Sequence, residues 1–222
     1  MTDSRQSGDR VAAHLRGFGP LGILFLVVIL LAGNIIGTVL VLIWVRLTGT
    51  PWREIGYVRD TPWLRTVVAG IAIGVVLKLL LKAIVMPLIG APPANAAYHY
   101  LAGNPAALPG ILFTVIVGGG FGEETIWRGY LFERMGRLMK PGVLANVIMV
   151  LITSVLFALA HIPGQGLPGA EQAVVTGLVF GTMYALSRSI WLQMIAHAAY
   201  DVLAVALIYG GLETRVAHLI FK

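Results

Sequence analysis

The sequence contains no cysteine. This absence excludes disulfides, thiolate metal sites and cysteine nucleophiles. Charge is also scarce, because Asp, Glu, Lys and Arg together make up 12% of the 222 residues, whereas a soluble globular domain has about 25%. The chain therefore lacks the surface chemistry of a soluble protein.

Two further absences concern nucleotides and nucleic acids. The glycine-rich run at Gly118 does not end in Gly-Lys-Ser/Thr, so it does not match a phosphate-binding loop. The net charge is +6, but the basic residues stand singly at the ends of apolar segments rather than in a patch. That distribution sets membrane topology, and we expect no nucleic-acid partner.

Apolar residues dominate the sequence. They make up 58% of the chain, and the mean hydropathy is +0.86. Since one membrane span needs about 20 apolar residues, the chain has room for about six to eight helices. We predict an all-α, polytopic transmembrane helical bundle in the lipid bilayer of a bacterial-type cell membrane. Residues 1–18 form a polar N-terminal tail, and residues 19–222 form a single integral membrane domain.

Six spans follow from the apolar runs. They are drawn over residues 21–45, 63–88, 108–137, 142–161, 170–188 and 189–209. Basic residues fall in alternate loops, which the positive-inside rule places in the cytoplasm. Six spans would then put the basic N-terminal tail on the other side, so the count and the rule conflict. Lys78 and Lys82, late in the second span, are expected to reach the interface.

Two adjacent carboxylates, Glu123 and Glu124, lie in one of these apolar segments. A charged side chain at membrane depth costs roughly 2.5 to 3.5 kcal/mol on insertion scales, so such groups usually face a wet cavity and carry function. Arg128 lies four residues after Glu124 and shares its helix face, while Glu123 is rotated by about 100°. We therefore predict that Glu124 is paired and that Glu123 is a free general base.

Two more pairs of residues carry chemistry. Phe157 and His161 are four apart at the end of a span, and His197 and Asp201 are four apart in the last span. An Asp one turn from a His can orient the imidazole and fix its tautomer. Convergence of these groups with Glu123 would supply a base for water and donors for an oxyanion. The sequence therefore predicts hydrolysis of a peptide bond at an active site within the membrane.

In the order and spacing of these motifs, the sequence resembles the CAAX protease and bacteriocin-processing family of intramembrane endopeptidases, which includes type II CAAX prenyl endopeptidases. The motifs are Glu-Glu-x-x-x-Arg from Glu123, Phe-x-x-x-His from Phe157 and His-x-x-x-Asp from His197. The resemblance covers residues 108–210, the motif-bearing core. It implies a protease acting on a hydrophobic or lipidated peptide, with prenylated CAAX-type tails as one such substrate.

The resemblance also implies roles for single residues. Glu123 would activate water with help from His161, His197 and residue 201 would support the oxyanion, and Glu124 with Arg128 would fix the site. Asp201 stands where eukaryotic members carry Asn. An ionised Asp cannot donate a hydrogen bond, so Asp201 would either be protonated or serve to orient His197.

Three alternatives stay open. Glu123 or Glu124 with the two histidines has ligand types that suit zinc. We favour a site without a cofactor, because His-Glu-x-x-His is absent and Arg128 competes for Glu124. The other two alternatives are non-enzymatic proteins of the same fold, namely an immunity or interaction protein and a proton-coupled transporter. A transporter would be expected to show internal pseudo-symmetry, which this sequence does not display.

Overall fold

The computed structural model describes residues 10–59 and 61–221, and within these ranges the chain forms helices and no strands. A short helix from Arg10 to Arg16 comes first. The α-helices that follow are α2 (Pro20–Leu31), α3 (Asn34–Thr48), α4 (Trp63–Leu80), α5 (Met86–Leu88), α6 (Leu108–Phe113), α7 (Leu131–Gly136), α8 (Val143–Ser187), α9 (Trp191–Tyr209) and α10 (Glu213–Ala217). Three π-helical segments, η2 (Leu81–Val85), η5 (Thr114–Glu123) and η6 (Thr125–Tyr130), join α4 to α5 and α6 to α7, and the short 3₁₀ helices are η1 (Trp52–Ile55), η3 (His99–Leu101) and η4 (Pro105–Ala107).

Four of these helical segments are long and apolar enough to cross a membrane, namely Trp63–Leu88, Pro105–Gly136, Val143–Ser187 and Trp191–Tyr209. The count becomes five if the bent pair Arg10–Arg16 and Pro20–Leu31 is one span. The predicted fold class, an all-α bundle of membrane-spanning helices, is confirmed.

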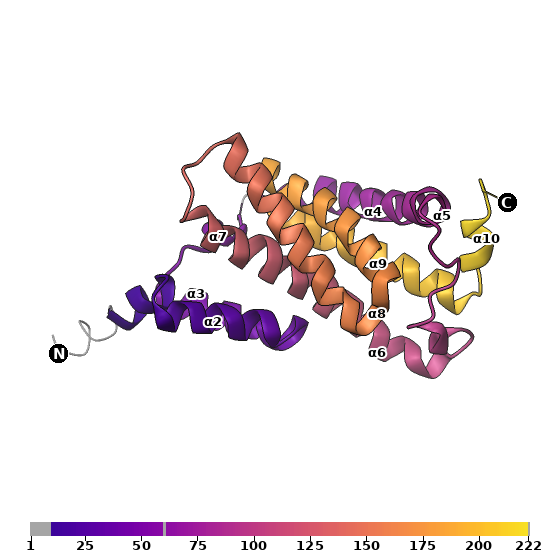
Figure 1. The fold of residues 1–222 in the computed structure, drawn as a ribbon, viewed down its shortest axis with the longest axis horizontal. Coiled ribbons are helices and arrows are strands. Elements are labelled where there is room, and N and C mark those ends of the chain that lie inside the picture. The colour runs from indigo at the N-terminus through magenta and orange to yellow at the C-terminus, as the bar shows by residue number, and fades with distance from the viewer. Residues whose placement is uncertain (1–9, 60, 222) are drawn as a thin grey trace.

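The longest helix, α8, consists of two antiparallel arms. Gly166 lies between Pro163 and Pro168 and has a φ of 67°, which breaks the helical path. A Cβ on Gly177 would lie 3.0 Å from Ser154, and one on Gly181 would lie 3.3 Å from Val150. The second arm therefore runs back along the first, as Figure 1 shows. These arms correspond to the predicted spans at 142–161 and 170–188.

The predicted first span over residues 21–45 is wrong. Gly33, with φ 77° and ψ −177°, turns the chain between α2 and α3, a conformation that side-chain-bearing residues rarely adopt. Trp44 Nε1 donates a hydrogen bond to the carbonyl of Leu15 at 3.1 Å, so α3 returns beside the short helix Arg10–Arg16 (Figure 1). The segment is a hairpin of 12- and 15-residue helices, each shorter than the roughly 20 residues that one span needs.

The hairpin removes the conflict between span count and charge. Arg134, at the end of α7, donates to the carbonyls of Arg16 and Gly17, and Arg16 pairs with Glu133 at 3.1 Å. The basic N-terminal helix therefore lies at the same end of the bundle as the basic loop that follows α7. Both then fall on one side of the membrane, as the positive-inside rule requires.

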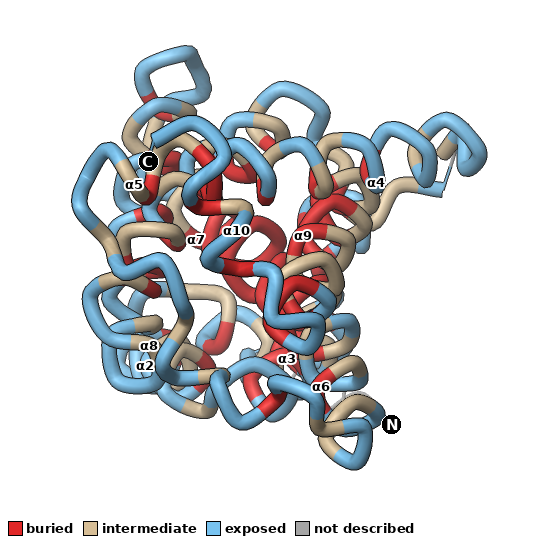
Figure 2. The backbone as a smooth tube through the Cα atoms, turned by 90° about the vertical axis from the view of Figure 1, so that its right-hand side faces the viewer, coloured by how far each residue is buried: buried red, intermediate tan, exposed pale blue. Residues whose placement is uncertain are grey.

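The core lies around α9, where buried residues from several helices meet (Figure 2). Glycines let α4 approach α9 closely, because a Cβ on Gly70 would lie 2.7 Å from Ile195 and one on Gly74 would meet the carbonyl of Ala196. This approach buries the next turns of α4. Lys78 and Lys82 are both buried, so the prediction that they reach the interface is wrong.

Candidate active site

The helix that carries the two glutamates is π-helical and rich in glycine. π-Helical turns are rare and occur frequently at functional sites. A Cβ on Gly120 would lie 2.7 Å from the side chain of Ala198 in α9, and one on Gly122 would lie 2.8 Å from Thr38 Oγ1 in α3. Bare glycines therefore allow α9 and the tip of the N-terminal hairpin to close on this helix. That closure brings both glutamates against α9.

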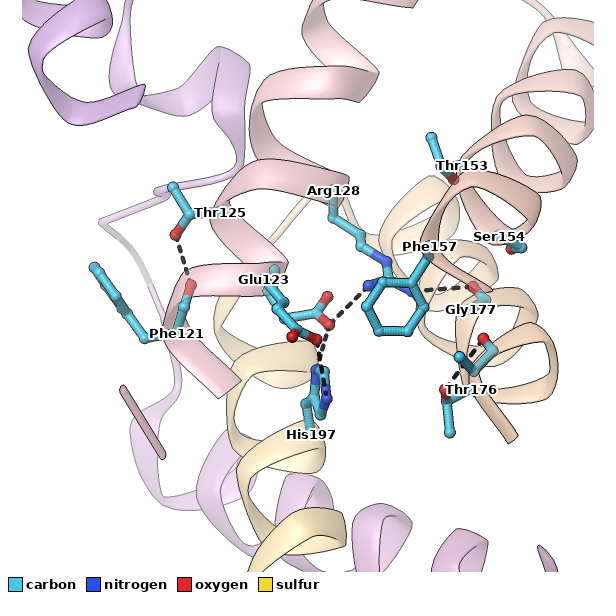
Figure 3. A network of polar contacts seen from close by, with 12 residues as sticks. Phe121, Glu123, Thr125, Arg128, Thr153, Ser154, Phe157, Thr176, Gly177 and His197 are labelled. Carbon is cyan, nitrogen blue, oxygen red and sulfur yellow. Dashed lines mark hydrogen bonds and ion pairs between the residues drawn. The ribbon is translucent and has the colours of Figure 1, made fainter. Parts of the chain in front are cut away.

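Glu124 is completely buried and joins its own helix to α9. Its Oε1 atom accepts from Arg128 Nη1 at 2.9 Å and from His197 Nδ1 at 2.8 Å. Figure 3 labels the two donors, Arg128 and His197, and marks their bonds as dashed lines. Because the Glu124 carboxylate accepts from this ring nitrogen, His197 Nδ1 carries a proton. Arg128 also donates from Nη2 to the carbonyl of Gly177 at 3.3 Å and packs over the ring of Phe157 at 4.9 Å. The predicted pairing of Glu124 with Arg128 is confirmed.

Glu123 has a different environment. Its carboxylate forms no hydrogen bond with any residue that the structure describes, and its Oε2 lies 3.7 Å from His197 Nε2. Asp201 Oδ2 lies 3.5 Å from the same nitrogen. The expected difference between a held and a free glutamate is therefore present. The expected contact of Asp201 with His197 exists, but Glu124, on the opposite side of the imidazole, makes the shorter bond that fixes the tautomer.

His161 approaches the site from the first arm of α8. Its Nδ1 donates to the carbonyl of Phe157 at 2.8 Å, because a carbonyl oxygen can only accept. In the neutral ring, Nε2 is then the acceptor. Among the described residues no direct hydrogen bond joins His161 to Glu123, and the two share the lining of one cavity.

This cavity has a volume of about 560 Å³, within the usual range of about 300 to 1,000 Å³ for ligand sites. Glu123, His161, His197 and Asp201 line it, whereas Glu124 and Arg128 lie behind them. The wall also contains Tyr98, Gln165, Lys78, Gln172 and Tyr200. Burial raises the pKa of the Tyr98 phenol above its ordinary value, so this hydroxyl keeps its proton and accepts from Gln165 Nε2 at 3.3 Å.

Sequence reasoning missed three parts of this site. Gly119 faces Asp201, and a Cβ there would lie 2.7 Å from Asp201 Oδ2. Lys78 donates to Gln172 Oε1 at 3.1 Å, and the Tyr200 hydroxyl donates to the same oxygen at 3.1 Å. The only signal in the sequence for Lys78 was a charge inside an apolar run. Gln172 and Tyr200 stand at no spacing that would have indicated a site.

The donor atoms of the site are not arranged for a metal ion. Within residues 10–59 and 61–221, no three His, Asp or Glu side chains are grouped as a metal ion requires. Glu124 Oε1 already accepts two N–H groups, so this oxygen is not available to a metal, whereas Glu124 Oε2 is buried and has no hydrogen-bond partner among the described residues. As these side chains are placed, they do not form a zinc site.

Comparison with protein families found one match. Residues 105–203 match the family model described as Type II CAAX prenyl endopeptidase Rce1-like. This segment is Rce1-like. The Rce1-like segment includes Glu123, Glu124, Arg128, His161, His197 and Asp201, which are all six predicted site residues. No match was found among curated proteins or among solved structures.

The Rce1-like family is a family of membrane proteases, and its match agrees with the apolar helices of the fold. The lipid bilayer is therefore the environment of this chain. Lys78 and the hairpin α2–α3 lie outside the Rce1-like segment, although Lys78 and Asn34, the first residue of α3, line the same cavity.

Proposed function

We propose that this protein is an intramembrane endopeptidase that hydrolyses a peptide bond in a membrane-associated or hydrophobic peptide, with Glu123 as the general base. The observation that carries the proposal is the contrast between two neighbouring glutamates. Glu124 is fixed by Arg128 and His197, whereas Glu123 lines the cavity without a hydrogen bond from the described residues. A carboxylate that lines the cavity and accepts no hydrogen bond from the protein is free to accept a proton, as a general base requires.

The proposed reaction begins with water in the cavity. Glu123 accepts a proton from this water, and the resulting hydroxide attacks the carbonyl carbon of the peptide bond. His161 Nε2, the acceptor nitrogen of the neutral ring, holds the second hydrogen of the water. Glu123 then returns the proton to the leaving amine as the carbon–nitrogen bond breaks.

The oxyanion of the tetrahedral intermediate needs a donor. His197 Nδ1 is committed to Glu124, so its Nε2 is the nitrogen that faces Glu123 and Asp201. In the imidazolium form, His197 donates from Nε2 to the oxyanion, and Asp201 orients the ring from the cavity side. A donor of this kind is worth about a hundredfold to a thousandfold in rate where it has been removed from other hydrolases.

Cleavage of quenched peptides by detergent-purified protein tests the proposal. The peptides should include hydrophobic and C-terminally lipidated sequences, among them prenylated CAAX-type tails. We expect the wild-type protein to cleave at least one class, and Glu123→Gln and His161→Ala to lose that activity. Chelator treatment is a separate arm: activity lost with chelator and restored by zinc would move the mechanism to a metal. A Glu123→Gln protein that cleaves at the wild-type rate would refute the base assignment.

A further inference from the structure

Two buried lysines of the second span have different partners. Lys82 Nζ forms an ion pair with Glu213 Oε1 at 2.8 Å, and Glu213 Oε2 accepts the backbone N–H of Asn95 at 3.1 Å. Lys78, one turn earlier, makes no ion pair with any carboxylate in the described part of the chain. Its partners are neutral: it donates to Gln172 Oε1 at 3.1 Å and lies 4.6 Å from the centre of the Tyr200 ring.

The environment of Lys78 leaves it short of acceptors. An ammonium group has three N–H donors, and only the one directed at Gln172 has an assigned partner. The Tyr200 hydroxyl donates to that same oxygen, which further occupies it. Burying a charge without a counter-charge is expensive, and buried charges are normally paired or bound to a ligand. Lys78 is 8% exposed, so the missing acceptors have to come from the cavity that it lines, either as water or as a ligand.

Lys78 also lies in the wall of the cavity that holds Glu123, whereas Lys82 does not. Tyr200, which Lys78 contacts, is one turn from His197 along α9. A peptide that fills this cavity with its reacting carbonyl at Glu123 therefore presents another of its groups to Lys78.

We propose that Lys78 binds a carboxylate of the peptide substrate and so determines which peptides are held for cleavage. The inference rests on the proposed function, because it takes the cavity to be the peptide site. The Lys78 ammonium supplies the positive charge, and Gln172 and Tyr200 fix its position. The carboxylate comes either from the carboxyl terminus of the peptide or from an Asp or Glu side chain. Lys78 is a binding residue in this account and takes no part in the proton transfers.

Binding to the inactive Glu123→Gln protein tests the inference without relying on cleavage. Two pairs of fluorescent hydrophobic peptides are used, one with a free carboxyl terminus against the matching carboxamide, and one amidated pair with Glu against Gln at one position. We expect the carboxylate to bind roughly tenfold or more tightly in one of the two pairs, as for a hydrogen bond between charged groups. The pair that shows the preference identifies the source of the carboxylate.

Variants at the two lysines supply the controls. Lys78→Met should abolish the preference, Lys78→Arg should retain much of it, and Lys82→Met should leave it unchanged, with folding of each followed by thermal unfolding. Equal binding within both peptide pairs, or a preference that survives Lys78→Met, would overturn the inference. The comparison within each peptide pair is made on the protein that retains Lys78. Equal binding there would therefore overturn the inference whether or not Lys78→Met folds.

The same peptides separate this inference from the proposed function. If the protein with Glu123 intact cleaves none of them, the endopeptidase proposal is contradicted for these peptides, while the binding ratios still decide the role of Lys78. If they are cleaved, the preference should appear as a lower KM for the carboxylate peptide, and kcat should change little.

Discussion

Glu124 and His197, which are 73 residues apart in sequence and lie on different helices, are joined by a hydrogen bond of 2.8 Å between Oε1 and Nδ1. The same oxygen accepts from Arg128. One carboxylate therefore fixes both a guanidinium and an imidazole, and the next residue, Glu123, is left free in the cavity. Neighbours in sequence thus have different structural tasks.

Replacement by Gln should affect activity at Glu123 and stability at Glu124. Glu123→Gln should lower peptide cleavage by at least a hundredfold, because a general base contributes about that much or more, and should leave thermal stability close to wild type. Glu124→Gln should lower the unfolding temperature, since removal of one partner from a buried ion pair costs about 3 to 5 kcal/mol. Cleavage rates and thermal unfolding in detergent measure both effects.

The pairing itself is checked by adding Arg128→Met to Glu124→Gln. The loss of unfolding free energy in the double variant should be smaller than the sum of the losses in the two single variants. Each single variant leaves one buried charge without its partner, whereas the double variant removes both charges. Strict additivity would contradict the pairing.

Gly119→Ala should impair catalysis without unfolding the protein. A Cβ at this position would lie 2.7 Å from Asp201 Oδ2, so the carboxylate must move away from His197. The neighbouring Gly118→Ala is the matched control, because its nearest atom would be Asn34 Cβ at 3.6 Å, an ordinary contact. We expect a loss of kcat of about tenfold or more for Gly119→Ala and a small effect for Gly118→Ala. Equal rates for the two variants would argue against a role for the position of Asp201.

Gly33→Ala should destabilise the N-terminal hairpin. The backbone at Gly33 has φ 77° and ψ −177°, and a residue with a side chain is strained there by about 1 to 3 kcal/mol. Gly19→Ala is the control, since Gly19 has an ordinary φ of −72° and open space at its Cβ position. Thermal unfolding should occur at a lower temperature for Gly33→Ala alone. An unchanged unfolding temperature would mean that the turn contributes little to stability.

The absence of cysteine makes the sidedness of the bundle directly measurable. Tyr100 and Leu138 are exposed at opposite ends, and Leu138 lies in the basic loop with Arg137 and Lys140. The positive-inside rule predicts that Tyr100→Cys in intact cells reacts with a membrane-impermeant maleimide and that Leu138→Cys reacts only after the membrane is opened. Leu186→Cys, near Arg188, should behave as Leu138→Cys does. The reverse pattern would show that the basic end faces outward.

Much of the fold was predictable because bilayer insertion is a local property of sequence. Apolar runs long enough to cross the hydrocarbon layer must be helical there, and five of the six predicted runs agree closely with the observed helical segments, two of them with the arms of α8. The first run misled the prediction because Gly33 and Asn34 are a short interruption in a run that is otherwise largely apolar and carries no charge up to Val45. Hydropathy does not register a turn that depends on one backbone conformation.

The site divides in the same way. The sequence by itself determined which acids and bases are present, and helical spacing determined the Glu124–Arg128 pair, because residues four apart meet on one helix face. Only the tertiary structure decided that His197 bonds to Glu124 with one nitrogen and faces Asp201 with the other, and that Lys78 enters the cavity beside Gln172. These contacts join residues of different helices, and their geometry depends on how closely glycines such as Gly74 and Gly120 let the helices approach.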